Sequence, residues 1–122
     1  MENCKHLKIL VAEDNKIQSF VINKLLTETG VQITNAYNGK EAVELTSNGK
    51  FDIILMNIQM PSMDGFEATR EIRKFNSDII IIAETNWGGI REKCIEGGFN
   101  DYIRKPFSKE AIIELIKKHI KI

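Results

Sequence analysis

The sequence predicts a doubly wound α/β fold in which a five-stranded parallel sheet lies between two layers of helices. Short apolar runs that suit buried strands alternate with segments whose apolar residues recur every three or four positions, as on one face of a helix. This alternation repeats five times within 122 residues, and no linker, internal repeat or low-complexity tract interrupts it. We therefore expect residues 1–122 to form a single domain.

The expected strands are short apolar runs, several of them rich in β-branched residues. The first suits a strand buried on both faces, whereas the second is less apolar and is expected nearer an edge of the sheet. The third carries one polar side chain, Asn57, at its C-terminal tip. The five runs span residues 7–12, 31–37, 53–56, 79–83 and 102–104.

The expected helices lie between or after these strands, and glycines or capping residues mark several of their ends. They are placed before Gly30, over residues 41–46, over residues 64–75, before Gly97, and after the N-cap Ser108. The third of these segments is expected to point its apolar side chains inward, and apolar side chains mark all five segments as helices. These are Ile17, Phe20, Val21 and Leu25, then Ala42, Val43 and Leu45, then Phe66, Ile72 and Phe75, then Ile90, Cys94 and Ile95, and finally Ile112, Leu115, Ile116 and Ile120.

The composition favours a soluble globular protein, with 43% apolar and 28% charged residues. Because 17 basic residues balance 17 acidic ones, nothing suggests nucleic acid or an anionic membrane as a partner. No segment approaches the roughly 20 apolar residues of a membrane span, and residues 1–6 lack the apolar core of a signal peptide. Cys4 and Cys94 lack metal-ligand spacing and are expected to be reduced. We expect a cytoplasmic protein.

Polar side chains stand at the ends of four strands: Glu13 and Asp14 after the first, Asn57 at the third, Thr85 after the fourth and Lys105 after the fifth. The carboxyl ends of parallel strands share one edge of the sheet, where ligands collect. Two adjacent carboxylates repel each other unless a cation joins them, and Mg²⁺ takes oxygen ligands. An ammonium and a hydroxyl suit the oxygens of a transferring phosphoryl group.

The motifs at these positions resemble the receiver domains of two-component response regulators, particularly those of hybrid kinases. The resemblance covers essentially the whole chain. Its segments are ILVAEDN at residues 9–15, ILMNIQMP at 54–61, MDG at 63–65, Thr85, and DYIRKP at 101–106. It implies a flavodoxin-like fold and a phosphorelay module that takes a phosphoryl group from a histidine kinase or histidine phosphotransfer protein.

The resemblance also implies a magnesium site. Glu13 and Asp14 would hold the ion directly or through water, and the backbone carbonyl of Gln59 would be a further ligand. The oxygen of Asn57 could still face the ion, although the amide carries no charge. We therefore expect Mg²⁺ to bind weakly, and no organic cofactor.

Other roles follow from the same resemblance. Lys105 and Thr85 would contact the phosphoryl oxygens, and Tyr102 would be the aromatic residue that switches inward, although a half-buried core role suits it nearly as well. The peptide bond before Pro106 would be cis. The last two helices and the last strand would form the contact surface for a partner, which could be a second copy of the chain.

Asn57 departs from the family pattern, because members that accept phosphate have aspartate at this position. A neutral amide cannot act as the nucleophile that forms an acyl phosphate. We therefore expect a pseudo-receiver that is not an enzyme and acts through protein contacts. The alternative is an ordinary receiver in which Asn57 is an introduced substitution.

Further departures favour a natural pseudo-receiver over an introduced change. The segment between Thr85 and Tyr102 is slightly shorter than is usual. Asn86 replaces a small residue and would crowd the entrance to the phosphate position. Glu84 occupies a strand position that is usually apolar.

Two other functions fit less well. A Mg²⁺-dependent phosphohydrolase of related fold needs a strand-tip aspartate, usually with a second acid two residues later, where this chain has Asn57 and Gln59. A flavin-binding module would need its first loop to cradle a phosphate, which Glu13 and Asp14 would repel.

Overall fold

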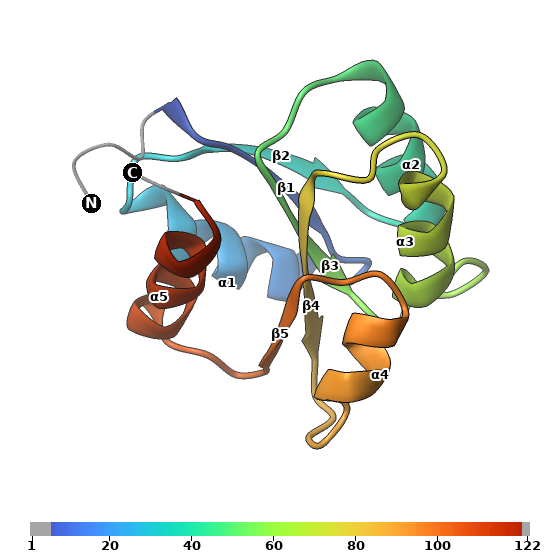
Figure 1. The fold of residues 1–122 in the computed structure, drawn as a ribbon. Helices are drawn as coiled ribbons and strands as arrows, with labels where there is room; N and C mark the ends of the chain where they lie inside the picture. The colour runs from blue at the N-terminus through green and yellow to red at the C-terminus, as the bar shows by residue number, and fades with distance from the viewer. Residues whose placement is uncertain (1–5, 121–122) are drawn as a thin grey trace.

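The computed structural model describes residues 6–120 and confirms the predicted five-stranded parallel sheet (Figure 1). The strand order is β2-β1-β3-β4-β5, the flavodoxin-like order of doubly wound sheets. β2 is an edge strand, as its weaker apolar character predicts. The strands are β1 (Lys8–Ala12), β2 (Gln32–Ala36), β3 (Ile53–Asn57), β4 (Ile80–Thr85) and β5 (Asp101–Arg104).

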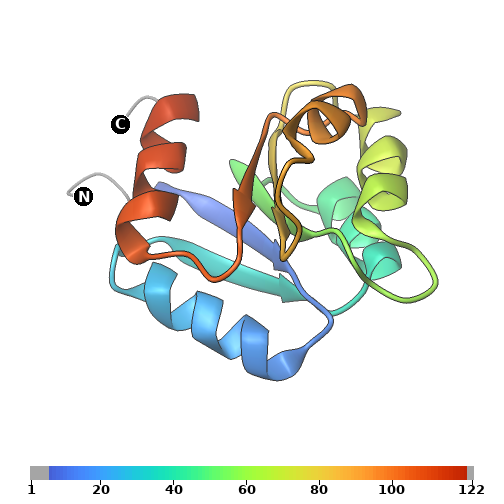
Figure 2. The ribbon, with the colours of Figure 1, turned by 90° about the horizontal axis from the view of Figure 1, so that it is seen from below.

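The helices cover the sheet on both sides (Figures 1 and 2). α1 and α5 pack on one face, and α2, α3 and α4 pack on the other, each face with its own apolar cluster. β3 is buried along its whole length, which fixes the position of its last residue, Asn57. The helices are α1 (Lys16–Thr27), α2 (Gly39–Asn48), α3 (Gly65–Arg73), α4 (Arg91–Glu96) and α5 (Lys109–His119).

Polar caps set the start of four helices. Asn15, Asn38, Asp64 and Ser108 each accept a hydrogen bond from the backbone N–H three residues later, which satisfies a donor that the helix itself leaves free. Asp64 also forms a reciprocal capping box with Glu67. The expected cap at Ser108 is therefore confirmed.

The apolar residues whose spacing predicts α1 do form a helix, but they do not face the core. Ile17, Phe20 and Val21 are 77%, 60% and 53% exposed, and Leu25 is only half-buried. The helix instead buries Ser19, Ile22 and Leu26.

The reason is that apolar residues occupy more than one side of α1, so their spacing does not fix which side meets the sheet. Ile22 and Leu26 pack in the cluster that also holds Ile112 and Ile116 of α5. Ser19, on the same side, donates to Asn35 Oδ1 of β2. These contacts leave a row of large apolar side chains in solvent.

Phe75, which is expected to point inward, is also exposed, and so is Ile95. Phe75 lies beyond the end of α3 and is 48% exposed, and Ile95 of α4 is 44% exposed. By contrast, Ile72 is buried as predicted, and Cys94 is buried as well. The Cys94 thiol is free, whereas Cys4 lies outside the described residues.

A buried acid connects α4, β5 and α5. Asp101 is the first residue of β5, and its side chain is almost fully buried. It pairs with Arg91, with Lys118 Nζ at 3.1 Å and with His119 Nε2 at 2.9 Å. Burial alone would raise the pKa of Asp101, but hydrogen bonds from His119, Tyr102 N–H, Arg91 and Lys118 bring it well below its usual range.

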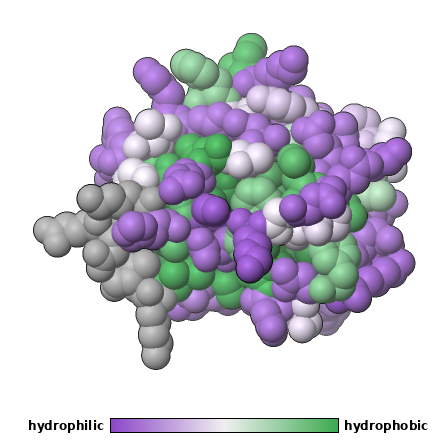
Figure 3. All heavy atoms as spheres, turned by 90° about the horizontal axis from the view of Figure 1, so that it is seen from above, coloured by the Kyte–Doolittle hydropathy of each residue, from purple (hydrophilic) through white to green (hydrophobic). Residues whose placement is uncertain are grey.

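Seen from the edge at which the strands begin, the surface is mostly hydrophilic around a central group of apolar side chains (Figure 3). Within residues 6–120, none of the helices has the length and apolar character needed to cross a membrane.

Candidate functional site

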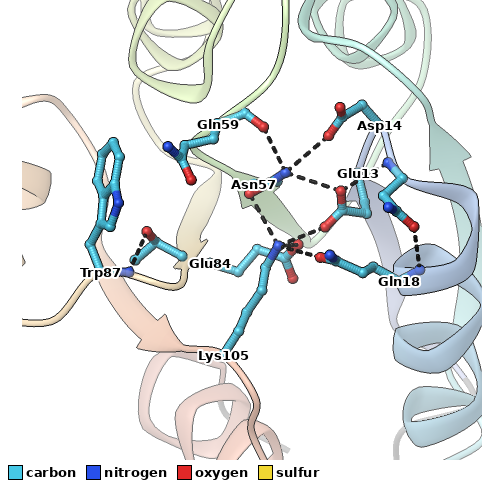
Figure 4. A network of polar contacts seen from close by, with 10 residues as sticks. Glu13, Asp14, Gln18, Asn57, Gln59, Glu84, Trp87 and Lys105 are labelled. Atoms are coloured by element: carbon cyan, nitrogen blue, oxygen red, sulfur yellow. Dashed lines mark hydrogen bonds and ion pairs between the residues drawn. The ribbon is translucent and has the colours of Figure 1, made fainter.

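The residues predicted to form the site meet at the C-terminal edge of the sheet (Figure 4). Asn57 ends β3, Glu13 and Asp14 follow β1, and Lys105 follows β5. β1 and β3 are neighbours although β2 lies between them in sequence, so the strand order reverses here. In doubly wound sheets such a crevice is where ligands bind.

Asn57 is 5% exposed and lies at the centre of the site. Its Nδ2 donates to Glu13 Oε2 at 3.0 Å, to Asp14 Oδ1 at 3.1 Å and to the backbone carbonyl of Gln59 at 3.0 Å. Its Oδ1 accepts from Lys105 Nζ at 3.2 Å. The amide oxygen therefore faces the ammonium, and the amide nitrogen faces the three oxygens that the resemblance assigns to a metal.

Lys105 is held in the site by several oxygens. Its Nζ donates to Glu13 Oε1 at 2.8 Å and to Gln18 Oε1 at 2.8 Å, in addition to Asn57. A fourth oxygen, Glu84 Oε1, lies 3.5 Å away. All three ammonium protons thus have partners inside the protein.

Sequence reasoning did not find Gln18. It lies in the first turn of α1, where its backbone N–H bonds to the cap Asn15, and this places its side chain toward Lys105 (Figure 4). The only signal in the sequence is its position one helical turn after Asp14.

Glu84 is fully buried beside these groups. It is the register partner of Asn57 across β3 and β4, and neither of its carboxyl oxygens accepts a hydrogen bond from any described residue. Burial raises the pKa of Glu84 well above its ordinary value and contact with Glu13 raises it further, while Lys105 acts in the opposite direction. The carboxyl therefore favours its protonated form.

The two acids after β1 differ in their surroundings. Burial alone would raise the pKa of Glu13, but contact with Glu84 and hydrogen bonds from Lys105 and Asn15 N–H lower it. Burial and the neighbouring Glu13 raise the pKa of Asp14, and the hydrogen bond from Asn57 opposes them. Glu13 is therefore the more firmly ionised of the two.

Thr85 and Tyr102 take the positions expected of them. Thr85 is buried at the end of β4, where its Oγ1 accepts a hydrogen bond from the backbone N–H of Trp87 at 3.0 Å. The Tyr102 side chain is half-buried and packs against the cluster beneath α2, α3 and α4. Trp87 is 44% exposed, and the loop after Thr85 leads into an α4 of only six residues.

Two backbone features hold the edge of the site. The peptide bond between Lys105 and Pro106 is cis, as expected. Gly65 lies against the end of β3, where a Cβ would come within 2.5 Å of the Asn57 carbonyl oxygen. The start of α3 can therefore approach the strand this closely only with glycine.

The comparison with protein families decides what this site belongs to. The family model described as response regulator receiver domain matches residues 9–117. The chain is a member of the receiver domain family. As such it is a receiver module of two-component phosphorelay signalling.

Known relatives agree with this assignment. Hybrid signal transduction histidine kinase B of Dictyostelium discoideum is 41% identical over 129 residues, which cover 93% of this chain but 7% of that kinase. The receiver domain of sensor histidine kinase PA1611 from Pseudomonas aeruginosa is 35% identical, with a TM-score of 0.86 over 93% of this chain and 96% of that one. This receiver domain thus spans a small part of the curated kinases that it matches first.

Two solved receiver structures bear on the chemistry. The PA1611 domain is described with a magnesium ion coordinated in its active-site cleft. The receiver domain of Ssk1 from Saccharomyces cerevisiae is described in a co-crystal with the histidine phosphotransfer protein Ypd1. It is 28% identical, with a TM-score of 0.86 over 93% of this chain and 88% of that one.

The residues of this receiver domain, as they are arranged, do not fit Mg²⁺. The three oxygens that would face the ion already accept hydrogen bonds from Asn57 Nδ2. The oxygens lie 3.0–3.1 Å from Nδ2, so an ion at the position of this nitrogen would be about 1 Å farther from each oxygen than an Mg–O bond allows. Within residues 6–120, no three His, Cys, Asp or Glu side chains are grouped to hold a metal.

Proposed function

We propose that this receiver domain is a pseudo-receiver of the cytoplasm, which binds phosphorelay proteins but does not accept a phosphoryl group and is not an enzyme. The observation that carries the proposal is Asn57 at the end of β3, where phospho-accepting receivers have aspartate. A side-chain amide has no anionic oxygen with which to attack a phosphohistidine.

The surrounding contacts support the proposal. Lys105, which would stabilise a phosphoryl group, has its ammonium bonded to Glu13, Gln18 and Asn57. The Thr85 hydroxyl is engaged by Trp87 N–H. Lys105 and Thr85, which would otherwise meet a phosphoryl group, thus have hydrogen-bond partners within the domain.

The buried Glu84 supports a natural pseudo-receiver rather than an introduced change at position 57. It adds a carboxyl directly beside Asn57 and Lys105, where a phosphorylated site would gain negative charge. Asn57 and Glu84 both depart from the family pattern and are neighbours. Natural divergence of this domain accounts for both, whereas a single introduced substitution accounts only for Asn57.

We further propose that the partner is a histidine phosphotransfer protein or the corresponding domain of a histidine kinase. A groove of about 270 Å³ runs beside the site, with Lys105 and Asn86 at one side and Ile17, Val21 and Phe107 along its walls. The exposed row of α1 borders this groove. A partner that reaches Asn57 would cover these apolar side chains. A related receiver domain is described in a co-crystal with the phosphotransfer protein Ypd1.

The direct experiment compares the wild-type chain with Asn57→Asp after exposure to acetyl phosphate or a phosphorylated phosphotransfer protein. Intact mass spectrometry and sensitivity to hydroxylamine report an acyl phosphate. We expect none on the wild-type chain, and a stable acyl phosphate on the wild type would refute the proposal. Phosphorylation of Asn57→Asp would show that the remaining site is competent, as the ordinary-receiver alternative requires.

A homodimer through α4, β5 and α5 remains part of this proposal. β5 is an edge strand, and a groove beside it is lined by Tyr102, Ala111 and Leu115, among others. Light scattering over a range of concentrations tests it. A dimer that dissociates when Leu115→Glu is introduced supports the surface, and a monomer at all concentrations excludes it.

A further inference from the structure

We propose that the amide nitrogen of Asn57 takes the place of the divalent cation, so that the site excludes Mg²⁺ by occupancy and not merely by its lower charge. This inference rests on the proposed pseudo-receiver function in one respect: it treats Asn57 as the natural residue at the phosphoacceptor position. It assigns Asn57 a positive role: the residue holds together groups that repel one another.

The first support is the set of partners around the nitrogen. Nδ2 contacts one oxygen from Glu13, one from Asp14 and the carbonyl of Gln59, all at 3.0–3.1 Å. These oxygens come from two loops, after β1 and after β3, and the amide joins both (Figure 4). A side-chain amide has only two N–H groups, so the three acceptors share them.

The second support is that the amide cannot be turned over. With nitrogen and oxygen exchanged, Oδ1 would face two carboxylates and a carbonyl, which offer no proton, and Nδ2 would face the Lys105 ammonium, which accepts none. The hydrogen-bond network therefore selects the orientation in which the partly positive end of the amide points at the acids.

The third support is the balance of charge without a metal. Lys105 lies 2.8 Å from Glu13 and supplies one full positive charge. The Asn57 amide donates hydrogen bonds to both acids, Glu13 and Asp14. Lys105 thus offsets one of the two negative charges, and the amide donors of Asn57 bond to the oxygens of both acids.

Occupancy and loss of charge make opposite predictions for Asn57→Ala. Alanine is as neutral as asparagine and also lacks its oxygen, so if charge alone weakened the metal site, Asn57→Ala would bind no better than the wild type. If the amide nitrogen blocks the site, removing it frees Glu13, Asp14 and the Gln59 carbonyl, and Asn57→Ala binds more tightly.

The experiment measures Mg²⁺ and Mn²⁺ binding by calorimetry, and the shift of the melting temperature with each metal, on the wild type, Asn57→Ala and Asn57→Asp. A matched control is Asn48→Ala, which removes an exposed amide at the end of α2. We expect Asn57→Ala to bind at least about tenfold more tightly than the wild type, because the metal no longer displaces hydrogen bonds to charged groups. The control should bind as the wild type does.

Every other outcome overturns the proposal. Wild type binding as tightly as Asn57→Ala would show that the amide does not block the metal. Binding by Asn57→Asp alone would show that charge is what matters. Binding by none of them would place the obstacle elsewhere. If Asn57→Ala does not fold, Asn57→Ser replaces it. Since no phosphoryl donor is present, failure here is distinct from failure of the proposed function.

Discussion

Lys105 Nζ lies 2.8 Å from Glu13 Oε1, and this ion pair joins the ends of β5 and β1 across 92 positions of sequence. The Lys105 side chain is 12% exposed and that of Glu13 is 1% exposed. Water therefore screens the pair poorly. In this receiver domain the ion pair is part of the fold as well as of the site.

Replacing Lys105 with methionine should destabilise the protein by about 2–4 kcal/mol, because it leaves the buried Glu13 carboxylate without its counter-charge. Chemical denaturation measures the change. Lys109→Met is the matched control, because Lys109 pairs with Glu28 on the surface, where ion pairs contribute little. Equal effects of the two substitutions would contradict the structural role of Lys105.

Glu84→Leu should stabilise the protein by about 1–3 kcal/mol, because it removes a buried carboxyl whose oxygens accept no hydrogen bond and which lies against a second acid, Glu13. Lys105 would keep its hydrogen bonds to Glu13, Gln18 and Asn57. Thermal unfolding reports the gain, with the exposed Glu44→Leu as the control. A lower melting temperature for Glu84→Leu would show that Lys105 requires the second acid.

Asp101→Asn should cost about 2–4 kcal/mol at pH 7, since Asp101 is buried among Arg91, Lys118 and His119. The folded pKa of Asp101 lies below its unfolded value. Its contribution is therefore present above about pH 4 and is lost as the pH falls further.

The difference in unfolding free energy between wild type and Asp101→Asn should thus shrink below about pH 4. Denaturation at a series of pH values measures it. Asp78→Asn, at an exposed site, should have little effect at any of them. A difference that stays constant down to low pH would mean that the Asp101 charge contributes nothing.

The strands and the shared edge of the site were predictable because they depend on local sequence. Apolar runs at β1, β3 and β4 identify buried strands, and parallel order brings Glu13, Asn57 and Lys105 to one edge. The motif resemblance supplied the expected roles of these residues, which stay predictions.

The exposed face of α1 was not predictable from spacing. Ile17, Phe20 and Val21 repeat as core residues do, yet they face solvent. What turns the helix is its contact with distant elements, such as the bond from Ser19 to Asn35. Periodicity shows that a helix has an apolar face but not whether the fold or a partner covers it.

The contacts of Asn57 were likewise beyond sequence reasoning. An amide presents both a donor and an acceptor, and the sequence suggested that its oxygen would face a metal ion. The position of Lys105 Nζ beside Oδ1 decides the matter, because it turns the nitrogen toward the acids. This contact spans 48 positions of sequence.

A double substitution, Ile17→Ser with Phe20→Ser, should weaken binding of a phosphotransfer protein by about tenfold or more, because large apolar side chains at the centre of an interface supply most of its affinity. Stability should change little, since both side chains are exposed. Calorimetric titration measures the affinity. Phe75→Ser, at an exposed phenylalanine beyond α3, serves as the control, and equal losses would exclude α1 as the docking surface.

The side-chain amide signals of Asn57 in a ¹H–¹⁵N spectrum test the account most directly. They are assigned by their absence from Asn57→Asp. We predict that both protons exchange slowly with solvent, because Glu13, Asp14 and the Gln59 carbonyl hold them, and that millimolar Mg²⁺ leaves the signals in place. Rapidly exchanging protons, or signals that move to saturation with Mg²⁺, would contradict the claim that this amide occupies the position of the cation.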